Sequence, residues 1–228
     1  LLCPPVALAQ DTIFEGEGNW NDDSLWDFGI PEDGGTAIIN GICTITEDTA
    51  SQNSLNPSGI AIGDGVEGFL RVSGGTLSGA HGGNRGILVG RGEGGIGTLI
   101  IDQGASFRSQ GGGMVVRIGD LDGGMGTVIV EGELLNFKFF ELLNGTLEMR
   151  PTGVNAKFNQ NDTLSVIGAD GTLSYVMDGP NVGPLKKADG TGGLVLDIED
   201  GANLMITLTG DFSVGDSWTL TKYTEPVS

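Results

Sequence analysis

The chain has 228 residues and a net charge of −19, because it carries 30 acidic residues and only 11 basic ones. Such a charge repels nucleic acid and anionic membrane surfaces, so we exclude both as partners. Glycine accounts for 42 residues and aromatic residues for only 6%, a composition that favours tight turns and thin layers over a large globular core. No run of about 20 apolar residues is present, so no transmembrane segment is expected.

The first nine residues have the pattern of the end of an export signal. They are mostly apolar, and Ala7 and Ala9 place small residues at positions −3 and −1 of a cleavage before Gln10. We interpret residues 1–9 as the remnant of such a signal, with a short apolar strand as the alternative. The interpretation predicts a secreted protein, located outside the cell or at its surface.

Residues 10–57 are predicted to form an N-terminal cap and a first coil. Trp20 and Trp26 lie near the start of this segment, and bulky aromatic side chains can cover the apolar end of a stacked fold. Cys43 lies in an apolar stretch and is expected to be a buried, small hydrophobic side chain. A disulfide between Cys3 and Cys43 would require the N-terminal segment to be retained.

Residues 58–155 contain an internal repeat. The segment GRGEGGIGTLII at Gly90 occurs again 29 residues later as GDLDGGMGTVIV at Gly119, and a shorter copy, GDGVEGFLRV, begins at Gly63. A fixed period with insertions confined to turns is typical of a solenoid. A propeller of at least four blades, with about four strands in each, would need a longer chain.

Each repeat unit offers two or three short strands with glycine at the corners, which fits one coil of a parallel β-helix. Alignment of the units predicts two inward columns with a spacing of about 4.8 Å per coil. The first column contains Leu70, Leu99 and Val128, and the second contains Val72, Ile101 and Val130.

Residues 156–228 are predicted to form longer strands, because apolar residues alternate with a period of two between turns that contain Gly, Asp and Pro. Two arrangements remain open from the sequence, namely broader terminal coils and a small sandwich. The alternating segments are residues 163–166, 173–176, 194–198, 204–208 and 218–220.

Three charged residues occupy the same position in the aligned units, directly after the first glycine: Asp64, Arg91 and Asp120. Neighbouring coils would bring these side chains within about 5 Å of one another. Because opposite charges alternate along the column, we predict a structural salt-bridge ladder. The alternative is a calcium site that uses the acidic turns, with Asp64, Asp120 and Asp122 as its candidate ligands.

No catalytic set is expected. His81 is the only histidine and there are only two cysteines, so a zinc site of ordinary composition cannot be assembled. A Ser-His-Asp triad would have to use His81, which lies in a glycine-rich loop, and no Gly-x-Ser-x-Gly elbow is present. The basic residues that a polysaccharide lyase would need are scattered along the chain. We therefore predict no catalytic residues and no cofactor, with calcium as the one ion that the acidic turns would attract.

The opening segment contains Asn19-Trp20 and Leu25-Trp26 before Gly34-Gly35, the units end in Gly-Thr-Leu-Ile-Ile, and residues 210–220 read GDFSVGDSWTL. Together they resemble large bacterial surface proteins that carry autotransporter-type β-strand repeats or PEP-CTERM sorting signals. The resemblance implies a secreted, right-handed parallel β-helix used for surface structure or adhesion. It supplies no catalytic residues.

The sequence therefore predicts an all-β solenoid with a Trp-containing N-terminal cap and longer strands in its C-terminal third. The expected function is a non-enzymatic structural or adhesive module that associates end to end into filaments or contacts extracellular polysaccharide or a cell surface. The alternative is a carbohydrate-active enzyme, a polysaccharide lyase or a glycoside hydrolase, on the same scaffold.

Overall fold

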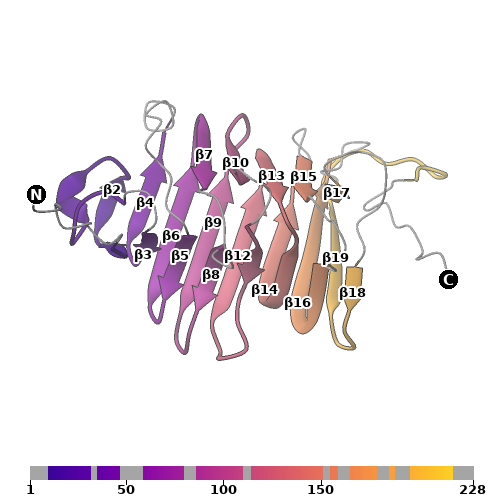
Figure 1. The fold of residues 1–228 in the computed structure, drawn as a ribbon. Helices are drawn as coiled ribbons and strands as arrows, with labels where there is room; N and C mark the ends of the chain where they lie inside the picture. Colours follow the sequence, from indigo (N-terminus) through magenta and orange to yellow (C-terminus); the bar gives the residue numbers. More distant parts are fainter. Residues whose placement is uncertain are drawn as a thin grey trace, which may run out of the picture.

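A computed structural model of the chain describes residues 10–31, 35–46, 59–79, 86–109, 114–150, 155–158, 165–178, 185–187 and 196–217. The predicted export-signal remnant with Cys3, and the loop with His81, lie outside these residues. Apart from one short 3-10 helix, η1 (Asp23–Leu25), the regular elements are all β-strands. They stack from the N-terminal to the C-terminal end as a right-handed parallel β-helix, as the sequence predicted (Figure 1).

The helix has three faces, and each face is a ladder of strands from successive coils. All the pairings between neighbouring strands are parallel. The first face contains β1 (Thr12–Phe14), β3 (Thr36–Ile39), β5 (Gly59–Asp64), β8 (Ile87–Arg91), β11 (Val116–Ile118), the first parts of β14 (Phe140–Met149) and β16 (Ser165–Met177), and β18 (Leu196–Ile198).

The second face runs alongside the first and contains the later parts of β14 and β16. Its other strands are β2 (Glu17–Asn19), β4 (Ile42–Ile45), β6 (Glu67–Val72), β9 (Ile96–Ile101), β12 (Met125–Val130) and β19 (Asn203–Leu208). The third face is a five-stranded sheet, so five of the described coils have all three faces. Its strands are β7 (Thr76–Gly79), β10 (Ser106–Ser109), β13 (Glu133–Phe137), β15 (Asn155–Phe158) and β17 (Leu185–Lys187).

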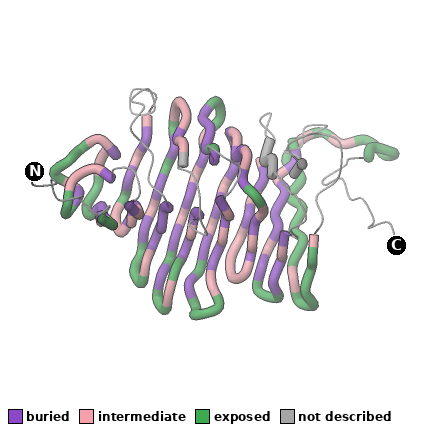
Figure 2. Tube along the Cα trace, in the orientation of Figure 1, coloured by how far each residue is buried: buried purple, intermediate pink, exposed green. Residues whose placement is uncertain are grey.

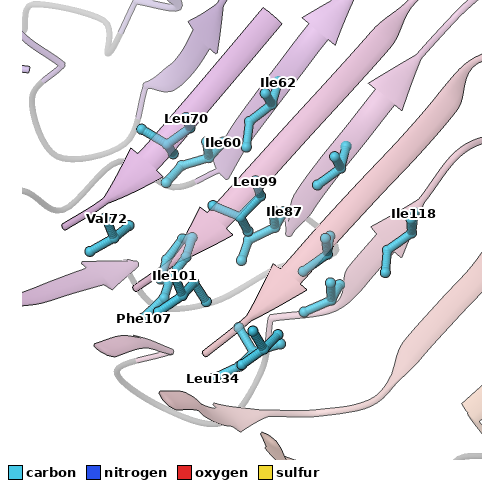
Figure 3. Close-up of a cluster of buried hydrophobic side chains, with 14 of the residues drawn as sticks. Ile60, Ile62, Leu70, Val72, Ile87, Leu99, Ile101, Phe107, Ile118 and Leu134 are labelled. Carbon is cyan, nitrogen blue, oxygen red and sulfur yellow. The ribbon is translucent and has the colours of Figure 1, made fainter. Parts of the chain in front are cut away.

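The core is a set of inward columns of aliphatic and aromatic side chains. Strand pairing aligns Leu70 with Leu99 and Leu99 with Val128, and the predicted second column of Val72, Ile101 and Val130 is aligned in the same way. All six side chains are fully buried, which confirms both columns. The first face contributes Ile60, Ile87 and Val116, and the third contributes Leu77, Phe107 and Leu134. Figure 3 labels Ile60, Ile87, Phe107 and Leu134 among these side chains. Alternation along each strand therefore supplies the core from all three faces at once.

Glycine forms the corner between the first two faces because the backbones of neighbouring coils nearly touch there. Gly90 has a φ of +74° and is the last but one residue of β8, where a left-handed residue turns the chain. Gly126 is the second residue of β12, and a Cβ there would lie 2.3 Å from the carbonyl oxygen of Val89 in the preceding coil. The recurring glycines of the sequence repeat are thus a packing requirement of this corner.

An aromatic cap covers the N-terminal end, as predicted. The rings of Trp20 and Trp26 meet edge to face at 5.0 Å, and those of Phe14 and Trp26 at 5.1 Å. The indole N–H of Trp26 donates to the carbonyl oxygen of Trp20 at 2.8 Å. The outer edge of β1 is also occupied, because the amide of Asp27 donates to the carbonyl of Ile13 and the Asp27 carboxylate accepts from the Ile13 amide.

The C-terminal part continues the same helix. β16 is a long strand in the segment where longer strands were predicted, whereas β17 and β18 have only three residues each. β14 has 10 residues and β16 has 13, and each of them crosses from the first face to the second. β18 and β19 then pair in parallel with β16, so these strands form coils. β19 is exposed along its whole length, with Leu204 62% and Ile206 47% exposed (Figure 2). Both residues continue inward columns that are buried in the earlier coils.

Candidate functional site: a charged groove on the first face

A groove of about 520 Å³ lies on the outside of the first face. Its floor consists of outward positions on β8, β11, β14 and β16, and its wall is the turn that follows β11. Because adjacent strands are in register, Leu88, Arg117, Glu141 and Val166 form one column along this floor. The charged side chains that line the groove are Arg91, Arg117, Asp120, Asp122 and Glu141.

Arg117 and Glu141 form an ion pair across two neighbouring strands. The Nε atom of Arg117 lies 2.6 Å from Oε2 of Glu141, and its Nη2 atom lies 2.5 Å from the same oxygen. Both side chains are partly exposed, so the pair is worth well under about 1 kcal/mol of stability. The pair matters for the chemistry of the groove, because Oε2 of Glu141 is already occupied by its contacts with Arg117.

Asp64 and Arg91 occupy equivalent positions on β5 and β8, as the repeat alignment placed them. The Nε atom of Arg91 lies 3.5 Å from Oδ1 of Asp64, with both side chains partly exposed. This contact is a second surface ion pair at the mouth of the groove. It joins two coils, whereas the Arg117–Glu141 pair joins the next two.

Asp120 is held by backbone amides. Its carboxylate accepts hydrogen bonds from the amides of Gly92 at 2.5 Å, Gly124 at 2.9 Å and Asp122 at 3.0 Å. Burial acts to raise the pKa of Asp120, but these three donors, together with the positive charge of Arg117, outweigh it and hold the pKa below its ordinary value. Asp120 is therefore an ionised clamp that fixes its own turn and the turn of the preceding coil.

The structure brings most of the residues singled out in the sequence to one place. Arg91, Asp120 and Asp122 line the groove, and Asp64 is bonded to Arg91 at its edge. Within the described residues, no group of three or more His, Cys, Asp or Glu side chains is arranged to hold a metal ion. Calcium binding at Asp64, Asp120 and Asp122 therefore remains a prediction.

Sequence reasoning missed Glu141 as a groove residue. Its strand lacks the glycine-rich turn of the earlier units, so the sequence repeat does not extend over this part of the coil. The signal that would have found it is the apolar alternation of Phe140 and Leu142, which are both buried and frame Glu141 as an outward position. Arg117 is one of the scattered basic residues, and its sequence context gives no sign of a partner.

Two further titratable groups lie in the core, away from the groove. Burial raises the pKa of the Cys43 thiol and of the Tyr175 phenol, so both stay protonated. Cys43 is buried without a disulfide partner among the described residues, in line with its expected role as a small apolar side chain. Neither group has the exposure that a nucleophile needs.

No family model, curated protein or solved structure matches this chain. In the part that the structure describes, no helix is long and apolar enough to cross a membrane.

Proposed function

We propose that the chain is a non-enzymatic structural and adhesive module, secreted or displayed at a cell surface. The observation that supports this proposal is that the carboxylates of Glu141 and Asp120 in the groove already accept hydrogen bonds from groups of the protein. Glu141 already accepts two bonds from Arg117, and Asp120 accepts three from backbone amides. These groups are committed to joining coils, which suits a rigid surface for contact better than proton transfer.

Acid-base catalysis on a glycan needs a carboxylic acid that keeps its proton near neutral pH, through a raised pKa. The pKa of Asp120 moves in the opposite direction, so this carboxyl is a poor general acid. The groove also contains aliphatic side chains, Leu88, Leu143 and Val166, between its charges. A surface of this mixed type can hold a ligand through apolar contact and hydrogen bonds without acting on it.

The extracellular location is supported by the export-signal pattern before Gln10 and by the net charge of −19. The adhesive role is supported by the arrangement of the described strands, because their stacked coils present long, regular faces (Figure 1). The extracellular location and the adhesive role are both parts of the proposal.

The experiment incubates purified protein with a panel of acidic and neutral polysaccharides. Reducing ends and unsaturated uronate products are measured over time, and binding to the same polymers is measured by co-sedimentation. We expect binding to at least one polymer without product. Steady release of either product would refute the non-enzymatic assignment, and absence of binding to every polymer would refute the adhesive one.

A carbohydrate-active enzyme is the second candidate, favoured by the presence of Asp120, Asp122 and Glu141 in one groove. Glu141→Gln would abolish product release if this candidate is correct. Glu148→Gln is the matched control, because Glu148 pairs with Arg150 on the second face, away from the groove. An equal loss of product release in both variants would point to a general effect on folding.

End-to-end association is a further part of the proposal, favoured by the exposed apolar residues of β19. A strand edge with unpaired backbone groups can add a strand from another molecule. We expect sedimentation velocity to show a concentration-dependent larger species that Ile206→Lys removes. A monomer at every concentration for the unmodified protein would refute this association.

A further inference from the structure

The third face differs from the other two in the sign of its charge. Among the strands that the structure describes, those of the first and second faces contain seven acidic and three basic residues. The five strands of the third face contain one acidic residue, Glu133, and four basic ones, although the whole chain has a net charge of −19. These basic residues are Arg108, Lys157, Lys186 and Lys187.

Three of the basic residues share one column of the third face. Strand pairing aligns Arg108 with Leu135 and Leu135 with Lys157. It then aligns Lys157 with Lys186. Arg108 is exposed, and Phe107 next to it in β10 is buried in the core, so the column has the outward register. We call Arg108, Lys157 and Lys186 the basic column.

The basic column is unfavourable for the isolated molecule. Lys157 and Lys186 are paired on neighbouring strands, about 4.8 Å apart, and like charges at paired positions destabilise a sheet. Glu133 lies in a different column, beside Ser106. Arg108 has no ion-pair partner among the described residues. A negative surface from outside the molecule would therefore compensate for charges that the fold itself leaves unbalanced.

The edge between the first and second faces carries the opposite charge. In five of the coils it presents an exposed acidic residue, and none of the five forms an ion pair among the described residues. The one basic residue described at this edge, Arg91, lies 3.5 Å from Asp64. The five residues, which we call the acidic edge, are Glu67, Glu93, Asp122, Asp170 and Asp200.

The acidic edge and the basic column lie on opposite sides of the molecule. In a helix with three faces, the edge between two of them lies opposite the third. Figure 1 shows the third-face strands β7, β10, β13 and β15 at the upper side of the molecule and the turns of the acidic edge at its lower side. Both sets of charges follow the helix axis with the spacing of the coils, about 4.8 Å. A second molecule that lies alongside can thus set its acidic edge against the basic column over several coils.

The net charge of −19 opposes contact between two copies, but its reach is short. The Debye length is about 8 Å at an ionic strength of about 0.15 M, so charges outside the contact are largely screened there. Ion pairs between exposed side chains are individually weak. We therefore expect an association that depends on both the salt and the protein concentration.

We propose that copies of this chain associate side by side, with the acidic edge of one molecule on the basic third face of the next. This inference deepens the structural role proposed above and rests on it. Each copy has the two surfaces on opposite sides, so it can contact two neighbours, and the contact repeats into a single layer of aligned solenoids. End-to-end association through β19 uses neither surface.

The test is sedimentation velocity of the whole chain over a range of concentrations, at about 0.15 M and about 1 M NaCl. The first variant is Lys157→Glu with Lys186→Glu, and the second is Glu67→Lys with Glu93→Lys. We expect each variant alone to associate at least about tenfold more weakly than the unmodified protein. An equal mixture of the two should associate again, because the reversed face of one matches the reversed edge of the other. The larger species should disappear at about 1 M NaCl, where the Debye length is about 3 Å.

The matched control for the second variant is Asp197→Lys with Asp211→Lys. It makes the same change in net charge at two exposed acidic residues that lie outside the acidic edge, and it should associate like the unmodified protein. Circular dichroism checks the fold of each variant. The second variant alters exposed side chains only, so comparison with its control tests the inference even if the first variant does not fold.

The outcomes separate this inference from the proposed function. If both charge-reversed variants associate like the unmodified protein, or if their mixture does not recover, side-by-side association is wrong and the proposed function stands. If only Ile206→Lys removes the larger species, association is end to end and the side-by-side inference fails alone. A monomer under all conditions would refute both kinds of association, and polysaccharide binding would still decide the adhesive role.

Discussion

The corner glycines offer the sharpest test of the packing described here. A Cβ on Gly126 would lie 2.3 Å from the carbonyl oxygen of Val89 and 2.6 Å from the amide nitrogen of Gly119. These two atoms form a hydrogen bond of 2.7 Å with each other across the corner. Gly126→Ala therefore pushes a methyl group into a backbone hydrogen bond between two coils. Since ordinary contacts between such atoms are about 3.5 Å or longer, the corner must open by roughly 1 Å.

The free energy of unfolding should fall by about 4 kcal/mol in Gly126→Ala. Overpacking of a close-packed site costs about 2 kcal/mol, and loss of the buried backbone hydrogen bond costs about 2 kcal/mol more. Gly123→Ala is the matched control in the neighbouring turn. Gly123 has a φ of +99°, and its Cβ would find nothing within 4 Å. That variant should lose only the conformational cost of an L-residue there, about 1 to 2 kcal/mol.

Urea unfolding followed by circular dichroism gives both values from the midpoint and the slope of the transition. The slopes should agree with that of the unmodified protein, since the substitutions leave the surface exposed on unfolding unchanged. The reasoning is wrong if Gly126→Ala is no less stable than Gly123→Ala, because the close approach of the two coils would then not be what requires glycine at position 126.

Three further variants test other parts of the structure. Leu99→Ala removes a fully buried side chain from an inward column and should cost about 3 kcal/mol in the same urea assay; a loss below about 1 kcal/mol would contradict the close packing of that column. Trp26→Ala removes the ring that packs on Phe14 and Trp20 and should cost about 4 kcal/mol, whereas Phe28→Ala, at an exposed neighbour, should change little. Asp120→Asn should cost about 1 to 2 kcal/mol at pH 7, because the amide accepts hydrogen bonds less strongly than the carboxylate. The folded-state pKa of Asp120 is lowered, so its contribution is complete above the unfolded pKa of about 4 and is lost as the pH falls through the folded value. Urea midpoints of the two proteins should therefore converge as the pH is lowered toward about 2, and a constant difference at all pH values would contradict the role given to the charge.

The parts of the fold that the sequence predicted are those with local signals. The columns that contain Leu99 and Ile101 follow from alternation within one strand and from the period of the repeat. The aromatic cap follows from Trp20 and Trp26, because two large rings near the end of a solenoid have few other places to pack.

The parts that the sequence missed depend on contacts between coils that differ in sequence. Glu141 precedes the only recognisable part of its coil, so its pairing with Arg117 could not be read from the repeat. Asp120 aligns with Asp64 and Arg91, yet its partners are backbone amides of two turns. Those hydrogen bonds depend on the backbone conformation of each turn. An alignment of residue types gives no information about that conformation.

Outward threonines on the second face are visible in the sequence as a recurrent Gly-Thr pair, at residues 97–98, 126–127, 145–146 and 171–172. Their lateral alignment depends on the exact register of four strands. A shift of one residue would turn the same threonines into the core. The strand register therefore determines whether the recurrent Gly-Thr pairs place their threonines on the outer surface or in the core.

The occupied edge of β1 has a consequence for how the molecule forms. The residues around Asp27 complete the first coil with contacts from only a short stretch of chain, so this coil needs nothing from later ones on its outer side. Only its other side is open to strand pairing. Each later coil can then pair with a coil that is already complete, from the N-terminal to the C-terminal end. The aromatic cap would thus be the first part of the helix to form, and the later coils would follow from the N-terminal to the C-terminal end.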